Sequence, residues 1–439
     1  MSAAFDLSLY REPQLQSVPR APETLEDLGI PGSLVEQLVL KMLFQRGEMS
    51  AWDLALAIGV KFSLIDGPLE TLKRQHLTLV KRAQGLGAVT SVFELSEEGR
   101  NQAREHLETN QYAGAAPVPI EQYIEQVRRQ KQKDGWLTPD KLAQAYRRMV
   151  VTPRILSQIG PAVSAGKSLL IYGQPGNGKT FLAEALVNLD DTPIYIPHSV
   201  LCQGHIVRVY DTVQHQRIDD VAREATLTKA AHQDGRWVKC RRPFLVSGGE
   251  LSMDMLDLSY NRTSKIYEAP FQMKANNGIY MIDDFGRQGA STAEILNRWI
   301  VPMERRIDYL TFLSGGKMTV PFETFLIFST NLKPQQLGDE AFLRRIQYKM
   351  LLRSPEAAEY AQIFEGFCQA RELPYEKETV ERFIEKRYRA TGKAFRRCHP
   401  RDVITHAIDL IHFESRPHEL TAALLDEAWE SCFTEDVED

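Results

Sequence analysis

Short, unbroken apolar runs separated by longer stretches with helical spacing characterise the chain from about residue 150 onward. Runs at 168–172, 278–282 and 325–330 have the length of buried strands, and each is followed by glycine-rich or polar residues. We predict 192–196 as the second strand of the same sheet. Because strands buried on both faces occur in parallel sheets covered by helices, this pattern predicts an α/β core. Beyond Ser354 the pattern becomes helical.

The region before this core has a different pattern. Apolar positions at helical spacing begin at Ser33, and Ser50 has the position of a residue that starts a second helix. A third helix with one apolar face precedes two short strands, near 77–80 and 92–95. Ser96 then caps a further helix.

This order of elements resembles a winged helix-turn-helix domain over roughly Ser33 to Leu107. In DNA-binding relatives the third helix enters the major groove and the wing contacts the backbone or the minor groove. The alternative is a protein-docking module. Acidic and basic residues are nearly balanced here, whereas phosphate binding needs a net positive surface, so we favour docking and keep DNA binding as the alternative. The basic residues that motivate DNA binding are Lys73, Arg74, Lys81 and Arg82.

A glycine-rich loop follows the first core strand directly and leads into a helical run from Phe181. The loop reads GQPGNGKT, a full Walker A motif. Its glycines let backbone N–H groups face phosphates, and the helix start adds a positive dipole end. We expect Lys179 to neutralise the β- and γ-phosphates of ATP and Thr180 to bind Mg²⁺. The candidate nucleotide-binding residues are Gly173, Gln174, Pro175, Gly176, Asn177, Gly178, Lys179 and Thr180.

Two carboxylates end the strand at 278–282, in the form of a Walker B motif. We expect Asp283 to complete the Mg²⁺ site with Thr180 and Asp284 to orient and activate the attacking water. The second acid is usually Glu in AAA+ ATPases. The side chain of Asp284 is one methylene shorter than that of Glu, so slow turnover of ATP remains an alternative.

Further motifs resemble those of AAA+ ATPases. Asn331, at the end of the strand at 325–330, matches the polar residue called sensor 1. The segment 339–345 resembles the one that delivers an arginine finger to a neighbouring subunit, with Arg345 favoured and Arg344 close behind. Arg401 matches sensor 2, an arginine of the lid domain that contacts the γ-phosphate, although Arg396 and Arg397 lie nearby.

The order of these motifs over residues 150–435 identifies the region as AAA+-like. Some eighty residues separate the strand at 192–196 from Walker B, and 307–313 and 317–321 flank a Ser-Gly-Gly turn that predicts a β-hairpin. An insert together with such a hairpin resembles the branch that holds MoxR-type ATPases, magnesium-chelatase subunits and bacterial enhancer-binding ATPases. The sequence Asp-Asp-Phe-Gly from Asp283 departs from that branch and is similar to helicase loaders of the IstB and DnaC kind.

The predicted fold class is α/β: a P-loop NTPase core of AAA+ type with a parallel sheet, a C-terminal helical lid and an N-terminal winged-helix (α+β) domain. Small residues and prolines over Tyr112–Pro119 are typical of a domain boundary. The predicted division is a flexible arm at 1–30, a winged-helix-like domain at 31–112, linker helices at 113–150, an ATPase core at 151–353 with an insert at about 201–276, and a lid at 354–439.

Composition and net charge argue against some classes of function. A net charge of -5 and a pI near 6.1 argue against a chain that coats nucleic acid or anionic membrane by bulk electrostatics. We expect no secretory signal and no membrane insertion, since no apolar stretch is long enough. Five widely spaced cysteines, an odd number, favour a reducing cytoplasm.

The sequence therefore predicts an ATPase that binds and hydrolyses ATP with Mg²⁺ in a homo-oligomeric ring, expected to be a hexamer. Such a ring would remodel, in a chaperone-like way, an unidentified protein client recruited by the N-terminal domain. One alternative is a DNA-directed regulator or helicase-loader-like ATPase that binds duplex through 31–112. Another is a slow, nucleotide-gated scaffold.

Overall fold

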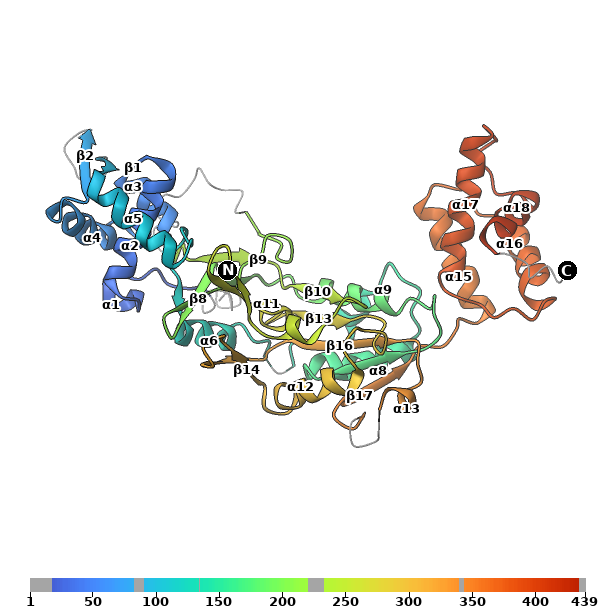
Figure 1. The fold of residues 1–439 in the computed structure, drawn as a ribbon. Coiled ribbons are helices and arrows are strands. Elements are labelled where there is room, and N and C mark those ends of the chain that lie inside the picture. The colour runs from blue at the N-terminus through green and yellow to red at the C-terminus, as the bar shows by residue number, and fades with distance from the viewer. Residues whose placement is uncertain (1–17, 83–90, 134, 220–232, 339–342, 434–439) are drawn as a thin grey trace, which may run out of the picture.

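The computed structural model describes residues 18–82, 91–133, 135–219, 233–338 and 343–433. Helices of the N-terminal region lie at one end of the molecule, a central parallel sheet lies in the middle, and a separate group of C-terminal helices lies at the other end (Figure 1). None of the described helices combines the length and the apolar character needed to cross a membrane.

The N-terminal module packs its helices around one small sheet. Three antiparallel strands run in the order β1-β3-β2. Ser50 caps α3, its hydroxyl accepting from Asp53 N at 3.0 Å, which confirms the predicted helix start. The elements are α1 (Leu25–Leu28), α2 (Gly32–Arg46), β1 (Glu48–Ser50), α3 (Ala51–Ile58), α4 (Phe62–Arg74), β2 (Thr78–Arg82), β3 (Val92–Leu95) and α5 (Glu97–Thr109).

Two sequence predictions concern the edges of this module. Within the expected flexible arm, α1 is a capped helix whose Leu28 is fully buried, so this part of the arm is folded. Residues 1–17 of the arm lie outside the described residues. The turn predicted at Gly85 and Gly87 also lies outside them.

The central sheet has five parallel strands in the order β10-β13-β16-β5-β17. The strands are β5 (Leu169–Tyr172), β10 (Phe244–Ser247), β13 (Ile279–Ile282), β16 (Phe325–Thr330) and β17 (Tyr348–Leu351). Its interior strands are almost continuously apolar, and Leu169, Leu170 and Ile171 have no exposed surface, as expected for a sheet covered on both faces. Helices α8 (Pro153–Ser164), α9 (Lys179–Glu184) and α12 (Thr292–Arg305) belong to this core.

The prediction that 192–196 forms the second strand of this sheet is wrong. Strand β6 (Ile194–Pro197) pairs in antiparallel fashion with β9 (Trp237–Cys240), and the two form a separate ribbon. The strand that pairs with β13 at this edge is β10, which lies within the insert predicted at about 201–276. Both segments are short apolar runs, so their pattern alone does not distinguish them.

Other strands of the insert form a second sheet together with β4, which precedes the core, in the order β11-β12-β8-β7-β4. Its members are β4 (Val118–Pro119), β7 (Ser199–Cys202), β8 (His205–Arg208), β11 (Ser259–Asn261) and β12 (Ile266–Glu268), with η5 (Met253–Leu256) and α11 (Phe271–Lys274) beyond the sheet. The predicted hairpin is confirmed as β14 (Ile307–Thr311) and β15 (Lys317–Pro321), with Leu310 opposite Met318. Both of these residues are buried in the same apolar core as the insert strands, so hairpin and insert form one unit.

The N-terminal module is joined tightly to the insert. Arg236 and Asp234 form an ion pair of 2.8 Å in which each side chain is only 2% exposed, and Arg236 Nη1 donates to Leu28 O at 3.0 Å. The backbones of Gly59 and Gly235 touch, because a Cβ on Gly59 would lie 2.7 Å from the carbonyl of Gly235. Module and insert thus meet through a buried, polar and closely packed contact.

The segment Tyr112–Pro119, predicted as a domain boundary, is part of this contact. Ala116 N donates to Ile58 O at 2.8 Å, and the Tyr112 hydroxyl donates to Ala115 O and accepts from Ser199 Oγ. Val118 has no exposed surface and pairs with the insert strand β7. Small residues and prolines here serve close packing and do not form an extended tether.

The remaining helices lie between the module and the core, within the core, and in the C-terminal region. Between the module and the core lie α6 (Ile120–Arg129) and α7 (Pro139–Ala145), and the core also holds η4 (Ala185–Leu189) and α13 (Pro334–Leu337). The C-terminal helices have their own apolar core, with Tyr360, Phe364 and Leu425 fully buried. They are α15 (Ala357–Ala370), α16 (Lys377–Ile384), the π-helical turn η6 (Glu385–Arg389), α17 (His399–Phe413) and α18 (Ala422–Cys432).

Candidate functional site

The glycine-rich loop lies where β5 ends and α9 begins, at the carboxyl edge of the parallel sheet. Gly176 and Gly178 adopt left-handed backbone conformations, with φ of 76° and 81°, which non-glycine residues rarely adopt. Strand, loop and helix therefore have the arrangement of a P-loop, and the core is an α/β fold of the P-loop NTPase kind.

Lys179 is held inside this loop. Its side chain is nearly buried, and Nζ donates to Gly173 O at 3.0 Å, Gln174 O at 3.2 Å and Asn331 Oδ1 at 2.5 Å. Burial lowers the pKa of the ammonium group, while the charges of Asp283 and Asp284 act in the opposite direction. The carbonyl oxygens that surround Nζ keep a cation in place above the loop.

Thr180 and Asp283 come together as the sequence predicts. Thr180 Oγ1 donates to Asp283 Oδ2 at 2.8 Å, so a hydroxyl and a carboxylate converge beside the loop. Oxygen donors of this kind, few in number and next to a phosphate-binding loop, fit Mg²⁺, which is usually held by one or two protein groups and substrate phosphates. The residues present thus fit a magnesium nucleotide.

Asp284 has an unusual backbone. Its φ is 48°, in the left-handed region, where Asp and Asn are several-fold enriched over other non-glycine residues. Asn331 Nδ2 donates to its Oδ1 at 3.0 Å. This conformation gives a local reason for Asp at a position where Glu is expected, because Asp is enriched in the left-handed region over other non-glycine residues.

Thr330, beside Asn331, has a supporting role. Its hydroxyl donates to Phe285 O at 2.7 Å and accepts from Leu332 N at 3.1 Å, and Phe285 N donates to Ser329 O. The loop after Walker B is thereby fastened to the end of β16, which sets the distance between Asp284 and Asn331.

A cavity of about 720 Å³ opens over these groups. Its floor is polar, formed by the glycine-rich loop with Asp283, Asp284 and Asn331. Its walls come from the chain before α8, from the starts of α8 and α9, and from helix α15 of the C-terminal region, and these walls are largely apolar. The wall residues include Met149, Val150, Val151, Ile155, Phe181, Ile363, Phe367 and Ala370.

Two arginines of the C-terminal region line the same cavity. Arg401, predicted from sequence, is 60% exposed and pairs with its neighbour Asp402 at 2.8 Å. Arg397 is 14% exposed and bridges Glu359 Oε1 at 2.5 Å and Val150 O at 3.0 Å. The structure places both arginines at the cavity. Arg397 is the less exposed of the two, and it contacts two other segments of the chain.

The C-terminal region also touches the glycine-rich loop directly. Cys398 N donates to Gly176 O at 2.9 Å, and Arg396 Nη1 donates to Ser354 Oγ at 2.7 Å. Asn177 is fully buried, and its Nδ2 lies 3.4 Å from both Leu352 O and Ser354 Oγ. Loop, connecting segment and helical region are therefore in contact on one side of the cavity.

Arg344 and Arg345 do not join this site. Neither is among the described residues that line the cavity. Arg344 is exposed, and Arg345 Nε lies 3.3 Å from Glu304 Oε1 on α12. Residues 339–342 of the predicted finger segment lie outside the described residues.

Sequence reasoning missed Arg397 and the apolar walls. The apolar run Met149-Val150-Val151 before a helix could have indicated a wall of the site. Runs of this kind are equally common in protein cores, so the pattern does not identify a site. The sequence shows Arg397 near Arg401 but does not reveal which of several close arginines faces the cavity.

The N-terminal module presents a surface of mixed charge. Lys73 pairs with Glu70 at 3.2 Å, and Lys81 pairs with both Glu48 and Glu94, at 2.6 and 3.3 Å. Two of the four basic residues that suggested DNA binding are thus matched by carboxylates. On α3, Trp52 is 53% exposed and Leu56 is 72% exposed, one helical turn apart.

Comparisons with known proteins give a family match over part of the chain and many matches among solved structures. Residues 356–431 match a family model described as a domain of unknown function, DUF8689. A search of curated proteins gives no match. The matched segment corresponds to the C-terminal helices α15 to α18.

Among solved structures, NtrX from Brucella abortus is similar with a TM-score of 0.37 and 12% identity, covering 76% of this chain and 64% of that one. A mutant of RuvB from Thermotoga maritima has a TM-score of 0.37 and 14% identity, covering 64% of this chain and 70% of that one. The chain spans less than two thirds of NtrX. Similarity this low establishes neither family membership nor function.

Proposed function

We propose that the protein is an ATPase of the AAA+ kind that binds ATP with Mg²⁺ in the cavity above the glycine-rich loop. One observation carries the proposal: Lys179, Thr180, Asp283, Asp284 and Asn331 converge on one face of a P-loop. A lysine, a hydroxyl and paired carboxylates are the groups that phosphoryl transfer from a nucleotide requires.

Each group has a distinct part. The loop N–H groups and Lys179 hold the phosphates, and Thr180 with Asp283 would hold Mg²⁺, which neutralises charge on the phosphate oxygens. Asp284 accepts a proton from the attacking water, and Asn331 orients both water and carboxylate. Asn331 already contacts Asp284 and Lys179, which supports this division of roles.

The apolar walls suit a nucleobase. Val150 and Val151 on one side and Ile363 and Phe367 on the other form a largely apolar space beside the polar floor, as small-molecule sites commonly do. Because one wall belongs to the C-terminal helices, nucleotide binding would draw these helices and the core together. This supports the role of a lid, with Arg397 or Arg401 reaching the phosphates.

We further propose that active sites are completed between subunits of a ring, expected to be a hexamer. Arg344 and Arg345 do not line the cavity of their own chain, which supports a role at a neighbour's site. Mixing Arg345→Ala with Lys179→Ala protein tests this, because some interfaces then combine an intact loop with an intact arginine. Recovery of ATPase activity from two inactive variants is expected; additive background activity excludes a shared site.

The N-terminal module is proposed to recruit a protein client. Its order of helices and strands supports a winged-helix-like domain, and the exposed Trp52 and Leu56 suit an apolar protein contact better than phosphates. Binding of the full-length chain to a labelled DNA duplex at low salt tests the DNA alternative. Duplex binding that weakens steeply with added salt would favour it over a protein client.

The central experiment measures nucleotide binding and hydrolysis together. Wild-type protein is expected to bind a fluorescent ATP analogue with Mg²⁺ and to release phosphate. Lys179→Ala should lose at least tenfold in affinity, whereas Lys167→Ala, an exposed lysine before β5, should not. Binding without measurable single-turnover hydrolysis would indicate a nucleotide-gated scaffold instead, and no binding would end the proposal.

A further inference from the structure

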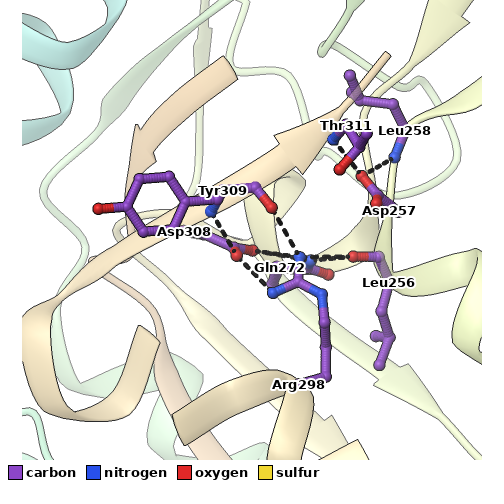
Figure 2. A network of polar contacts seen from close by, with 8 residues as sticks. All are labelled: Leu256, Asp257, Leu258, Gln272, Arg298, Asp308, Tyr309 and Thr311. Carbon is purple, nitrogen blue, oxygen red and sulfur yellow. Dashed lines mark hydrogen bonds and ion pairs between the residues drawn. The ribbon is translucent and has the colours of Figure 1, made fainter. Parts of the chain in front are cut away.

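A buried ion pair lies between the helix that follows Walker B and the hairpin. Arg298 on α12 donates to Asp308 on β14 through two bonds, Nη1 to Oδ1 at 2.6 Å and Nη2 to Oδ2 at 3.1 Å (Figure 2). The Asp308 side chain is 1% exposed and that of Arg298 is 18% exposed. Water therefore screens this pair little.

The insert joins the same network. Arg298 Nη2 also donates to Leu256 O at 3.1 Å, and Gln272 Nε2 donates to Leu256 O at 2.7 Å and to Asp308 Oδ2 at 3.1 Å. Close by, Asp257 accepts from Thr311 N at 2.7 Å, as Figure 2 shows. One guanidinium thus contacts the hairpin and the insert at once.

Stability alone does not explain such a pair. Desolvation offsets much of the attraction between buried charges, and apolar replacements often serve stability as well. A bidentate arginine–carboxylate pair does fix geometry, because its two parallel bonds allow only one register between helix and strand. Apolar contacts, such as those of Leu310 and Phe312 with the insert, permit more sliding.

The other end of α12 is tied to the nucleotide site. Gln288 Nε2 donates to Asp283 O at 2.8 Å, and its Oε1 accepts from Gly286 N at 2.8 Å. Ser291 and Glu294 then form a capping box that starts α12. A shift of the Walker B loop must accordingly move the start of this helix.

The hairpin is likewise tied to the insert and, through it, to the N-terminal module. Leu313 N donates to the Tyr267 hydroxyl at 3.1 Å, and Tyr267 lies on β12. Module and insert share the contact at Gly59 and Gly235 and the buried Arg236. From hairpin to module the contacts are continuous.

We infer that Arg298 and Asp308 are positioning residues, which transmit the nucleotide state at Asp283 and Asp284 to the unit formed by hairpin, insert and N-terminal module. This inference rests on the proposed ATPase function and adds how that function reaches the recruited partner. Neither residue touches the cavity, so the pair acts through α12 and β14 and not on the nucleotide.

The test uses the full-length chain and hydrogen exchange of residues 307–321, with and without Mg²⁺ and a non-hydrolysable ATP analogue. In wild type the analogue should change exchange in the hairpin at least twofold. The double variant Arg298→Met/Asp308→Asn removes both charges and leaves no buried charge unpaired. It should bind the analogue within twofold of wild type, yet show no such change in the hairpin.

Two controls separate the possible failures. Arg305→Met, an exposed arginine on the same helix, should keep the full response, and Arg298→Lys, which keeps charge without the planar fork, should keep part of it. An undiminished response in the double variant, or a wild type that binds the analogue with an unchanged hairpin, overturns the inference alone. A wild type that binds no analogue overturns the proposed function and this inference with it.

Discussion

The side-chain amide of Asn331 bridges Lys179 and Asp284. Its oxygen accepts from the lysine at 2.5 Å, and its nitrogen donates to the aspartate at 3.0 Å. One neutral residue thus joins the two charged groups for which phosphate binding and water activation are proposed. Arrival of a phosphate beside Lys179 would compete for the same ammonium protons and release the amide toward Asp284.

Asn331→Ala should lower the rate of ATP hydrolysis by about 10²–10³-fold while changing nucleotide affinity far less, because removing one preorganised hydrogen-bonding group from such a site has an effect of this order. Single-turnover rates and equilibrium binding of a fluorescent nucleotide measure the two effects. Combined with Asp284→Asn, the loss should be clearly less than the product of the single losses. Strictly multiplicative losses would contradict a joint role.

Asp284→Glu should destabilise the protein by about 1 kcal/mol, since the left-handed conformation of this residue is adopted more readily by Asp than by Glu. Asp284→Asn should be nearly neutral for stability, because Asn tolerates this conformation. Urea unfolding of both variants provides the comparison. Asp140→Glu, an exposed change in the first turn of α7, is the control and should have no effect.

The stability of the C-terminal helices should fall as the pH falls from about 6.5 toward 4. Burial, with Lys393 and Arg396 nearby, lowers the pKa of His399 to about 4, whereas the unfolded chain has the ordinary value of 6.5. Below pH 6.5 the unfolded state binds the proton first, so stability that is complete above this pH is lost on acidification. Between pH 7.5 and 5 the loss should be about 2 kcal/mol.

Urea denaturation followed by hydrogen exchange of 399–432 measures this loss. His399→Gln should remove most of the pH dependence in the window. His412→Gln, an exposed histidine on the same helix, should leave it unchanged. An equal slope for His399→Gln and wild type would assign the acid sensitivity to other groups.

Gly235→Ala should loosen the contact between the N-terminal module and the insert. A Cβ at this position would lie 2.9 Å from Gly59 Cα, closer than real side chains approach, so the backbones must separate. We expect about 1–3 kcal/mol of destabilisation, typical of overpacking, and faster hydrogen exchange across Tyr112–Pro119. Gly67→Ala, where the added methyl meets open space, is the matched control.

Structural features that depend on neighbouring residues could be predicted from the sequence. The glycine-rich loop, the cap at Ser50 and the hairpin turn depend on a few consecutive residues, and the structure has the predicted elements in each place. The same holds for the contact of Thr180 with Asp283, since the carboxyl ends of parallel strands meet at one edge of a sheet.

The pairing of strands and the orientation of side chains could not be predicted from the sequence. The strand at 192–196 and β10 are both short apolar runs, and only distant partners decide which joins the central sheet. The inward position of Arg397 depends on Glu359 and Val150, far from it in sequence. Asp284 has a left-handed backbone, and the neighbouring Phe285 O accepts a hydrogen bond from Thr330, which is distant in sequence; no local pattern indicates either feature.

The buried connection from Tyr112 to Pro119 decides how a recruited partner would meet the ATPase. A flexible tether of similar length would let the module explore a volume around the core and raise the local concentration of its cargo without orienting it. Here the connection is fixed at both ends, so cargo on Trp52 and Leu56 would be presented at one distance and in one orientation. If the module binds a client as proposed, this fixed connection would also set the orientation of the client, and small changes in the module contact would alter that orientation without weakening binding.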